Sequence, residues 1–193
     1  LNDFADDAYI VTDVGQHQMW AAQYYDFETS GRLLTSGGLG TMGYGLPAAM
    51  GAAYSGTDKP VINICGDGGF QMTMQELTTC AINDIPVKNI VLNNAYLGMV
   101  RQWQELFFDK RYAQTSLRDK NVIKEPDEKP EHEPQHYVPD FVRVAEGCGV
   151  KGLRATKPEE VEEVLQEGME HDGPVLMEFF TKKNENVFPM VPS

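Results

Sequence analysis

Short apolar runs alternate along this chain with longer amphipathic segments. Residues 61–65 and 87–92 are apolar without a helical period, which is typical of buried parallel strands. Further strands are predicted over residues 9–12, 151–155 and 175–180. Helices are predicted over residues 18–26, 46–53, 71–83, 139–146 and 158–170, with another beginning near Gly98. This alternation predicts an α/β fold, a three-layer sandwich in which helices flank a mostly parallel sheet.

Two segments are rich in charge. Residues 158–172 hold seven acidic side chains, but their apolar positions recur at helical spacing, and Thr156 with Glu159 forms a capping-box pattern. A solvated amphipathic helix is therefore favoured over an acidic binding surface. Residues 119–136 combine three prolines with six acidic and three basic residues, which favours a polar loop or insertion. His132 and His136 within it are interpreted as solvated side chains rather than a metal pair.

Composition narrows the class of protein. A length of 193 residues with 41% hydrophobic residues is expected to form one soluble domain. The net charge of -13 argues against nucleic-acid binding, which needs clustered Lys and Arg. Three widely separated cysteines indicate neither a zinc site nor a disulfide framework and fit a reducing compartment. No signal peptide or membrane-spanning run is expected.

Candidate chemistry follows two of the predicted strands. Asp67 lies in the run Gly66-Asp67-Gly68-Gly69 after one strand, and Asn94 follows the next, 27 positions later. Carboxyl ends of adjacent parallel strands meet at one edge of a sheet, where open α/β folds bind ligands. Mg²⁺ prefers hard oxygen ligands and commonly completes its shell with phosphate and water. Glycines allow the backbone to approach phosphate closely, so this pattern predicts a metal–diphosphate site.

The same residues carry a family resemblance. The GDG run followed by Asn93-Asn94 is similar to the thiamine diphosphate signature. Residues 35–49 (TSGGLGTMGYGLPAA) and 97–104 (LGMVRQWQ) resemble the carboxy-terminal cofactor-binding domain of acetohydroxyacid synthases, also called acetolactate synthases. The resemblance extends from Gly15 to Ser193, almost the whole chain.

The resemblance implies roles for individual residues. Asp67 and Asn94 match side-chain ligands of Mg²⁺, and the backbone carbonyl of Tyr96 matches a third ligand. Met42 matches the apolar side chain that props the cofactor in its V-shaped conformation. The positions that match cofactor contacts are Gln16, His17, Gly40, Met42, Gly66, Gly68, Gly69, Asn94, Tyr96, Gly98 and Met99. Met99 and Trp103 match the substrate channel, and Ser193 matches a position associated with inhibitor sensitivity. Gly69 departs from the Ser or Ala of many relatives.

The resemblance also implies a reaction and its partners. Pyruvate is decarboxylated and joined to a second 2-oxoacid, pyruvate or 2-oxobutyrate, in branched-chain amino acid biosynthesis. The glutamate that activates the cofactor lies in a pyrimidine-binding domain of a second subunit, and Glu76 does not match it. A further domain binds FAD. Because 193 residues hold neither domain, we expect an excised or separately encoded third domain, inactive alone.

The assembly implied is a homodimer with a possible regulatory small subunit, in the cytoplasm or in an organelle.

Two alternatives remain open. One is the cofactor-binding chain of a two-subunit 2-oxoacid decarboxylase such as sulfopyruvate decarboxylase, although the GMVRQWQ and FPMVPS runs favour the synthase. The other is a non-catalytic nucleotide-binding module. It is disfavoured because no clear strand is predicted directly before the glycine-rich run of residues 37–45.

Overall fold

A single parallel sheet forms the centre of the molecule. The computed structural model describes residues 1–5, 7–118 and 139–189. Within them six strands are ordered β2-β1-β3-β4-β6-β5, and every neighbouring pair is parallel. The strands are β1 (Tyr9–Thr12), β2 (Leu33–Thr35), β3 (Val61–Gly66), β4 (Lys88–Asn93), β5 (Lys151–Ala155) and β6 (Val175–Phe180). The predicted α/β class is confirmed.

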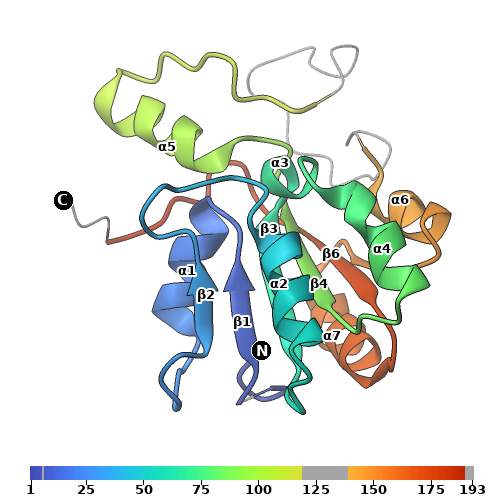
Figure 1. The fold of residues 1–193 in the computed structure, drawn as a ribbon. Coiled ribbons are helices and arrows are strands. Elements are labelled where there is room, and N and C mark those ends of the chain that lie inside the picture. The colour runs from blue at the N-terminus through green and yellow to red at the C-terminus, as the bar shows by residue number, and fades with distance from the viewer. Residues whose placement is uncertain (6, 119–138, 190–193) are drawn as a thin grey trace.

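Helices cover both faces of the sheet (Figure 1). One face packs against α1 (Gln16–Tyr24) and α7 (Val161–Glu170), and the other against α2 (Gly45–Tyr54), α4 (Leu77–Ile82) and α6 (Phe141–Gly147). This arrangement follows from right-handed crossovers between parallel strands. The remaining long helix, α5 (Gly98–Phe107), stands beyond the carboxyl ends of the strands. None of the helices in the described ranges has the length and apolar character needed to cross a bilayer.

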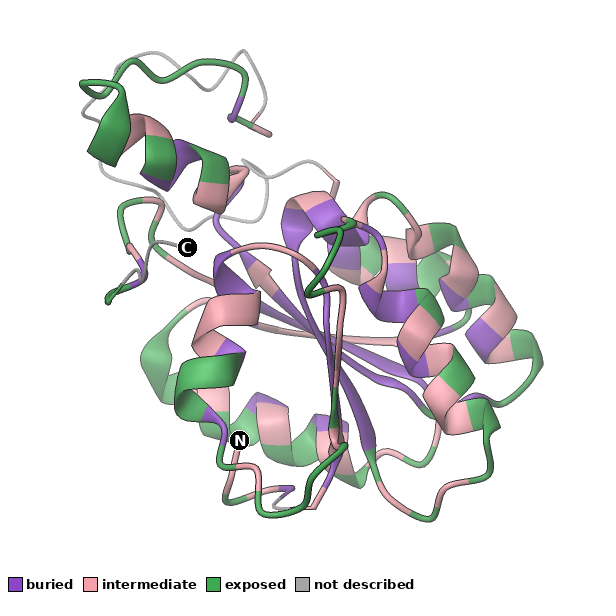
Figure 2. Cartoon of the chain, turned by 60° about the vertical axis from the view of Figure 1, so that its left-hand side comes forward, coloured by how far each residue is buried: buried purple, intermediate pink, exposed green. Residues whose placement is uncertain are grey.

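Alternating strand residues divide the core into two apolar clusters. Ile10, Ile62 and Met177 belong to the cluster under α1 and α7, whereas Val11 and Leu176 belong to the cluster under α2, α4 and α6. Figure 2 shows the central strands of the sheet as a buried layer between them, whereas the edge strands β2 and β5 are less buried. Truncating a fully buried aliphatic side chain of this kind to Ala costs about 2–5 kcal/mol. The strand ends that carry the candidate chemistry are therefore attached to the most firmly held part of the chain.

The helix predicted over residues 71–83 is wrong in its extent. A short helix, α3 (Asp67–Phe70), starts directly after β3, and a 3-10 turn over Met74–Glu76 precedes α4. The break lies at Thr73, whose backbone has φ -137° and ψ 10° and whose hydroxyl donates to the Gly43 carbonyl at 3.3 Å. That contact with a distant loop overrides the local helical pattern.

Two further details differ from the sequence prediction. Strand β2 was not predicted, because three half-exposed residues carry little periodicity. The capping partner of the 158–170 segment is Glu160 rather than Glu159: its carboxylate accepts from the Thr156 amide at 2.7 Å and the Lys157 amide at 3.1 Å. The first turn there is a 3-10 turn (Pro158–Glu160), which moves the capping position by one residue. His132 and His136 lie outside the described residues.

Candidate functional site

Asp67 lies at the carboxyl end of β3 and is buried. Its Oδ1 accepts a hydrogen bond from the Gly68 amide at 2.9 Å, whereas Oδ2 has no hydrogen-bond partner among the described residues. Burial raises the pKa of Asp67 to about 7, because removing the carboxylate from water disfavours its charged form. A cation beside Oδ2 would favour the charged carboxylate and so offset the cost of burying it.

Asn94 follows β4, the strand that pairs in parallel with β3. As predicted, Asp67 and Asn94 therefore follow adjacent strands at one edge of the sheet. The Asn94 Oδ1 accepts from the Tyr96 amide at 2.9 Å, which folds the loop into a tight turn. The same loop is held from outside, since Leu97 donates its amide to the Thr115 carbonyl at 2.8 Å. These two bonds hold the backbone of the loop.

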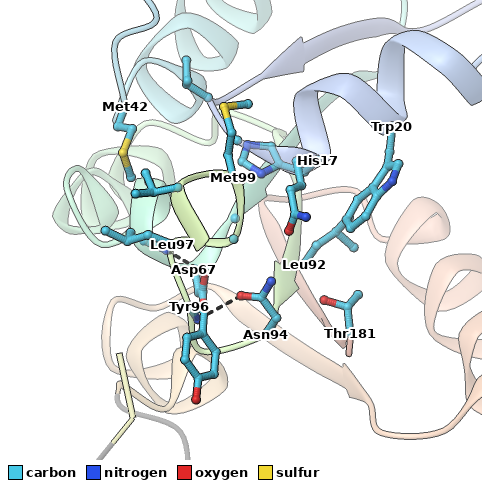
Figure 3. A pocket seen from close by; sticks show the side chains of 18 of the residues that line it. His17, Trp20, Met42, Asp67, Leu92, Asn94, Tyr96, Leu97, Met99 and Thr181 are labelled. Atoms are coloured by element: carbon cyan, nitrogen blue, oxygen red, sulfur yellow. Dashed lines mark hydrogen bonds between the residues drawn. The ribbon is translucent and has the colours of Figure 1, made fainter. Parts of the chain in front are cut away.

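These strand ends border a cavity of about 230 Å³ (Figure 3). Every candidate residue in the described part of the chain lines it: Gln16, His17, Gly40, Met42, Gly66, Asp67, Gly68, Gly69, Asn94, Tyr96, Gly98, Met99 and Trp103. Ser193 lies outside the described residues. The motifs assigned no role to seven other lining residues, Val14, Gly15, Trp20, Leu92, Leu97, Val100 and Thr181. Gly15, Leu97 and Val100 are direct sequence neighbours of candidate residues, and that adjacency was the available signal.

Glycines make room for polar side chains around this cavity. A Cβ atom at Gly98 would lie 2.1 Å from Gln16 Oε1 and 2.9 Å from Asn94 Nδ2. A Cβ atom at Gly66 would lie 2.9 Å from His17 Nδ1. Real Cβ atoms do not approach so closely, so a side chain at either position would displace Gln16 and Asn94, or His17. Because Gly66 and Gly98 have no side chains, the side chains of Gln16, His17 and Asn94 lie close to the backbone at these two positions.

Three buried polar atoms of this site have unused hydrogen-bonding capacity. Besides Asp67 Oδ2, they are Gln16 Oε1 and His17 Nε2, which find no hydrogen-bond partner among the described residues. Burial lowers the pKa of His17 to about 4, with nearby Asp13 opposing the shift, so its ring is neutral near pH 7. Buried polar atoms are normally paired, so unpaired ones beside a cavity leave positions where a polar ligand, an ion or water can bind.

The side chain of Gln16 presents its acceptor to the cavity. Its Nε2 donates to Gln102 Oε1 at 2.8 Å and to the Glu185 carbonyl at 2.9 Å. The free Oε1 therefore suits a donor, such as a metal-bound water or an amine, better than a phosphate oxygen. The neutral ring of His17 carries one N–H, which bonds to the Asp13 backbone, so its unpartnered Nε2 is an acceptor.

The described residues offer few side-chain ligands for a metal. Among the described residues no group of three or more His, Cys, Asp or Glu side chains could hold an ion. One carboxylate, one amide oxygen and backbone carbonyls fit Mg²⁺, which is commonly bound through one or two carboxylates together with substrate phosphates.

Asp13, which the sequence analysis did not single out, holds the loop that carries Met42. Its carboxylate accepts from the amides of Val14 at 2.8 Å, Gly43 at 3.1 Å and Gly45 at 2.8 Å. A Cβ atom at Gly69 would lie 2.1 Å from Asp13 Oδ1, so Asp13 fills the space that a Ser or Ala would need. Its position directly after a predicted strand was the signal available in the sequence.

The opposite wall of the cavity is apolar and more exposed. Met42 Cε lies 3.4 Å from the Cβ position at Gly68, and Leu97 contacts the same point. Met99 and Trp103 come from α5, and Trp103 is 42% exposed. The site thus has one buried polar wall on the sheet and one open apolar wall on a helix.

Comparison with known proteins agrees with this geometry. Residues 13–179 match the family model described as thiamine pyrophosphate enzyme, C-terminal TPP binding domain. The chain belongs to the thiamine pyrophosphate enzyme family. The matched range contains every candidate residue that lines the cavity.

Similar proteins include acetolactate synthases from distant organisms. The chain is 48% identical over 186 residues to the acetolactate synthase large subunit of Corynebacterium glutamicum, covering 96% of this chain and 28% of that protein. It is 45% identical over 190 residues to the mitochondrial catalytic subunit of Aspergillus candidus, covering 98% of this chain and 25% of that protein. It is 44% identical over 187 residues to acetolactate synthase 2, chloroplastic, of Zea mays, covering 97% of this chain and 28% of that protein. The resemblance predicted from the motifs is confirmed, and the chain spans about a quarter of the length of these relatives.

Proposed function

We propose that these residues form the Mg²⁺- and diphosphate-binding part of a thiamine diphosphate-dependent acetolactate synthase. The observation that carries the proposal is the pairing of Asp67, with its free buried oxygen, and Asn94 on adjacent strand ends beside a glycine-lined cavity. The family match and the acetolactate synthase relatives support the cofactor class and the reaction.

In this proposal the metal binds to Asp67 Oδ2, Asn94 Oδ1 and the Tyr96 carbonyl. The amide oxygen of Asn94 accepts one hydrogen bond, from the Tyr96 amide, and a carbonyl-type oxygen has two acceptor sites. It can therefore keep the turn and coordinate Mg²⁺ at once. The remaining positions of an octahedral shell would go to diphosphate oxygens and water.

Other residues would bind and orient the cofactor. The residues that border the cavity and would contact the cofactor are Gln16, His17, Gly40, Gly66, Gly68, Gly69 and Gly98. Met42, on the loop held by Asp13, is suited to support the bent conformation of the cofactor. Thiamine diphosphate, when bound, supplies the electron sink for decarboxylation of a 2-oxoacid. Met99 and Trp103 would border the path of pyruvate and 2-oxobutyrate.

The full reaction would require groups beyond these 193 residues. We propose that the activating glutamate comes from a pyrimidine-binding domain of a second subunit in a homodimer, and that FAD and a regulatory small subunit bind elsewhere. Turnover by these residues alone is not expected. The relatives include mitochondrial and chloroplastic proteins, and a cytoplasmic or organellar setting is proposed for this one.

Thermal unfolding with different ligands tests the proposal. A ligand that binds only the folded state raises the melting temperature. We expect stabilisation by thiamine diphosphate together with Mg²⁺, a smaller effect of either alone, and none by NAD. Stabilisation by NAD and not by the thiamine cofactor would favour a nucleotide-binding module and contradict the proposal. Acetolactate production by the purified chain alone would contradict its dependence on a second domain.

A further inference from the structure

A buried polar network crosses three strands near the metal-binding loop. Glu178 on β6 is 1% exposed, and its Oε2 accepts from Arg154 Nε on β5 at 2.7 Å. Its Oε1 accepts from Asn93 Nδ2 on β4 at 2.7 Å. Arg154 also bonds to Asp140, the residue that caps α6. Neither Glu178 nor Arg154 lines the candidate cavity.

The network ends on the backbone of the metal-binding loop. Because Asn93 Nδ2 donates to Glu178, its Oδ1 faces the other way and accepts from the Ala95 amide at 2.9 Å. Ala95 has φ 57°, a left-handed conformation that costs a non-glycine residue about 1 kcal/mol or more. Something must therefore hold Ala95 in place, and Asn94 and Tyr96 lie on either side of it.

A purely structural role does not account for this network well. Burying an ion pair contributes little net stability, because the desolvation of both charges offsets their attraction, and apolar replacements are often as stable. The neighbouring β6 residues Met177 and Phe179 pack as ordinary core side chains. Glu178 differs from them in supplying a hydrogen-bond acceptor that orients the Asn93 amide.

We propose that Glu178, itself oriented by Arg154, is a positioning residue for the metal-binding loop and acts through the Asn93 amide on the Ala95 backbone. The inference rests on the proposed function for the role of the loop in Mg²⁺ binding. The geometric part, that Glu178 holds the left-handed turn at Ala95, stands on the hydrogen bonds alone.

A matched pair of double variants separates the effect of the hydrogen-bond acceptor at position 178 from the effect of the buried ion pair. The variants Arg154→Met with Glu178→Gln and Arg154→Met with Glu178→Leu both remove the buried ion pair. Only the first keeps an oxygen that can accept from Asn93. Any effect of losing the Arg154–Asp140 bond is the same in both. Differences between the two variants therefore report on the Asn93 contact.

Two readouts on the 193-residue chain test the proposal. In the Leu variant we expect hydrogen exchange of the Ala95 amide to be about tenfold faster than in the Gln variant, with core amides of β3 unchanged. We also expect the affinity for Mg²⁺ with thiamine diphosphate to be about tenfold weaker, the size typical for losing an outer partner of a metal ligand.

The outcomes separate this proposal from the proposed function. Equal exchange of Ala95 in both variants would overturn the positioning role, as would a uniform loss of protection across the chain. Faster Ala95 exchange with unchanged affinity would overturn the link to the metal. If the unsubstituted chain binds no thiamine diphosphate with Mg²⁺, the proposed function fails and this link fails with it, while the exchange measurement still decides whether Glu178 holds the turn.

Discussion

The two walls of the candidate site differ in how they are built. The polar wall comes from the ends of β3 and β4, where Asp67 and Asn94 are buried and their loops are held by hydrogen bonds. The apolar wall comes from α5 and the loop of Met42, where Trp103 is half-exposed and Leu39 is 93% exposed. In the proposed function the polar wall needs no further residues to bind metal and diphosphate, whereas the apolar wall is exposed to solvent.

This difference divides the chemistry. Binding metal and diphosphate requires fixed oxygen and N–H groups, which strand ends and glycine backbone supply in advance. Shaping a bent cofactor and admitting substrate require apolar side chains whose positions depend on what covers them. We therefore expect the first task to survive in these 193 residues and the second to depend on further structure.

The largest expected effect is on the polar wall, from removing the Asp67 charge. Asp67→Asn should weaken binding of thiamine diphosphate with Mg²⁺ about 100-fold or more, because losses of outer-shell partners already cost about 10–100-fold. Isothermal titration calorimetry measures it. Asp58→Asn makes the same charge change at an exposed position and should leave the affinity unchanged. An Asp67 variant that binds normally would remove the basis of the polar wall.

The same residue should have a stability cost without metal. The pKa of Asp67 is raised from 3.8 in the unfolded chain to about 7 when folded. Its stabilising contribution is therefore fully present below about pH 4 and is lost as the pH rises to 7. Without divalent cations, the free energy of unfolding of the unsubstituted chain should fall by about 2 kcal/mol between pH 5 and 7, relative to that of Asp67→Asn. Urea unfolding at several pH values checks this, and a gap that is independent of pH would contradict it.

A smaller loss is expected where the two walls meet. Gly98→Ala would place a Cβ atom 2.1 Å from Gln16 Oε1 and should displace both Gln16 and Asn94. We expect roughly tenfold weaker binding and about 1–3 kcal/mol lower stability, as for other overpacked positions. Gly51→Ala on α2 meets nothing within 4 Å and serves as the control. Equal affinity and equal stability of the two variants would show that the absence of a side chain at Gly98 does not matter for binding.

The smallest effects should come from the apolar wall. Met42→Ala should weaken thiamine diphosphate several-fold and leave the affinity for Mg²⁺ with inorganic pyrophosphate within about twofold, since Met42 lies outside the set of diphosphate contacts proposed above. Trp103→Leu should change neither. Competition between thiamine diphosphate and inorganic pyrophosphate, in the presence of Mg²⁺, measures both affinities for each variant. A large loss of pyrophosphate binding in Met42→Ala would mean that the two walls are not separable.

Local signals in the sequence predicted the fold class and the polar wall. Asp67 and Asn94 each follow an apolar strand, and their pairing required only that the two strands be neighbours. Features made by contacts between distant segments were not predicted. The Thr73 bond to Gly43 breaks a helical pattern, Asp13 clamps a loop thirty residues away, and Glu178 reaches Asn93 across β4 and β6. No periodicity encodes such contacts, because each depends on the assembled sheet.

The central claim is that the polar wall is complete within these residues, and one titration tests it most directly. Thiamine diphosphate is titrated into the 193-residue chain by calorimetry, once with Mg²⁺ and once with a chelator of divalent cations. The account predicts saturable binding at one site per chain with Mg²⁺ and little or none in the chelator. Equal binding in both conditions, or no binding with Mg²⁺, would contradict it.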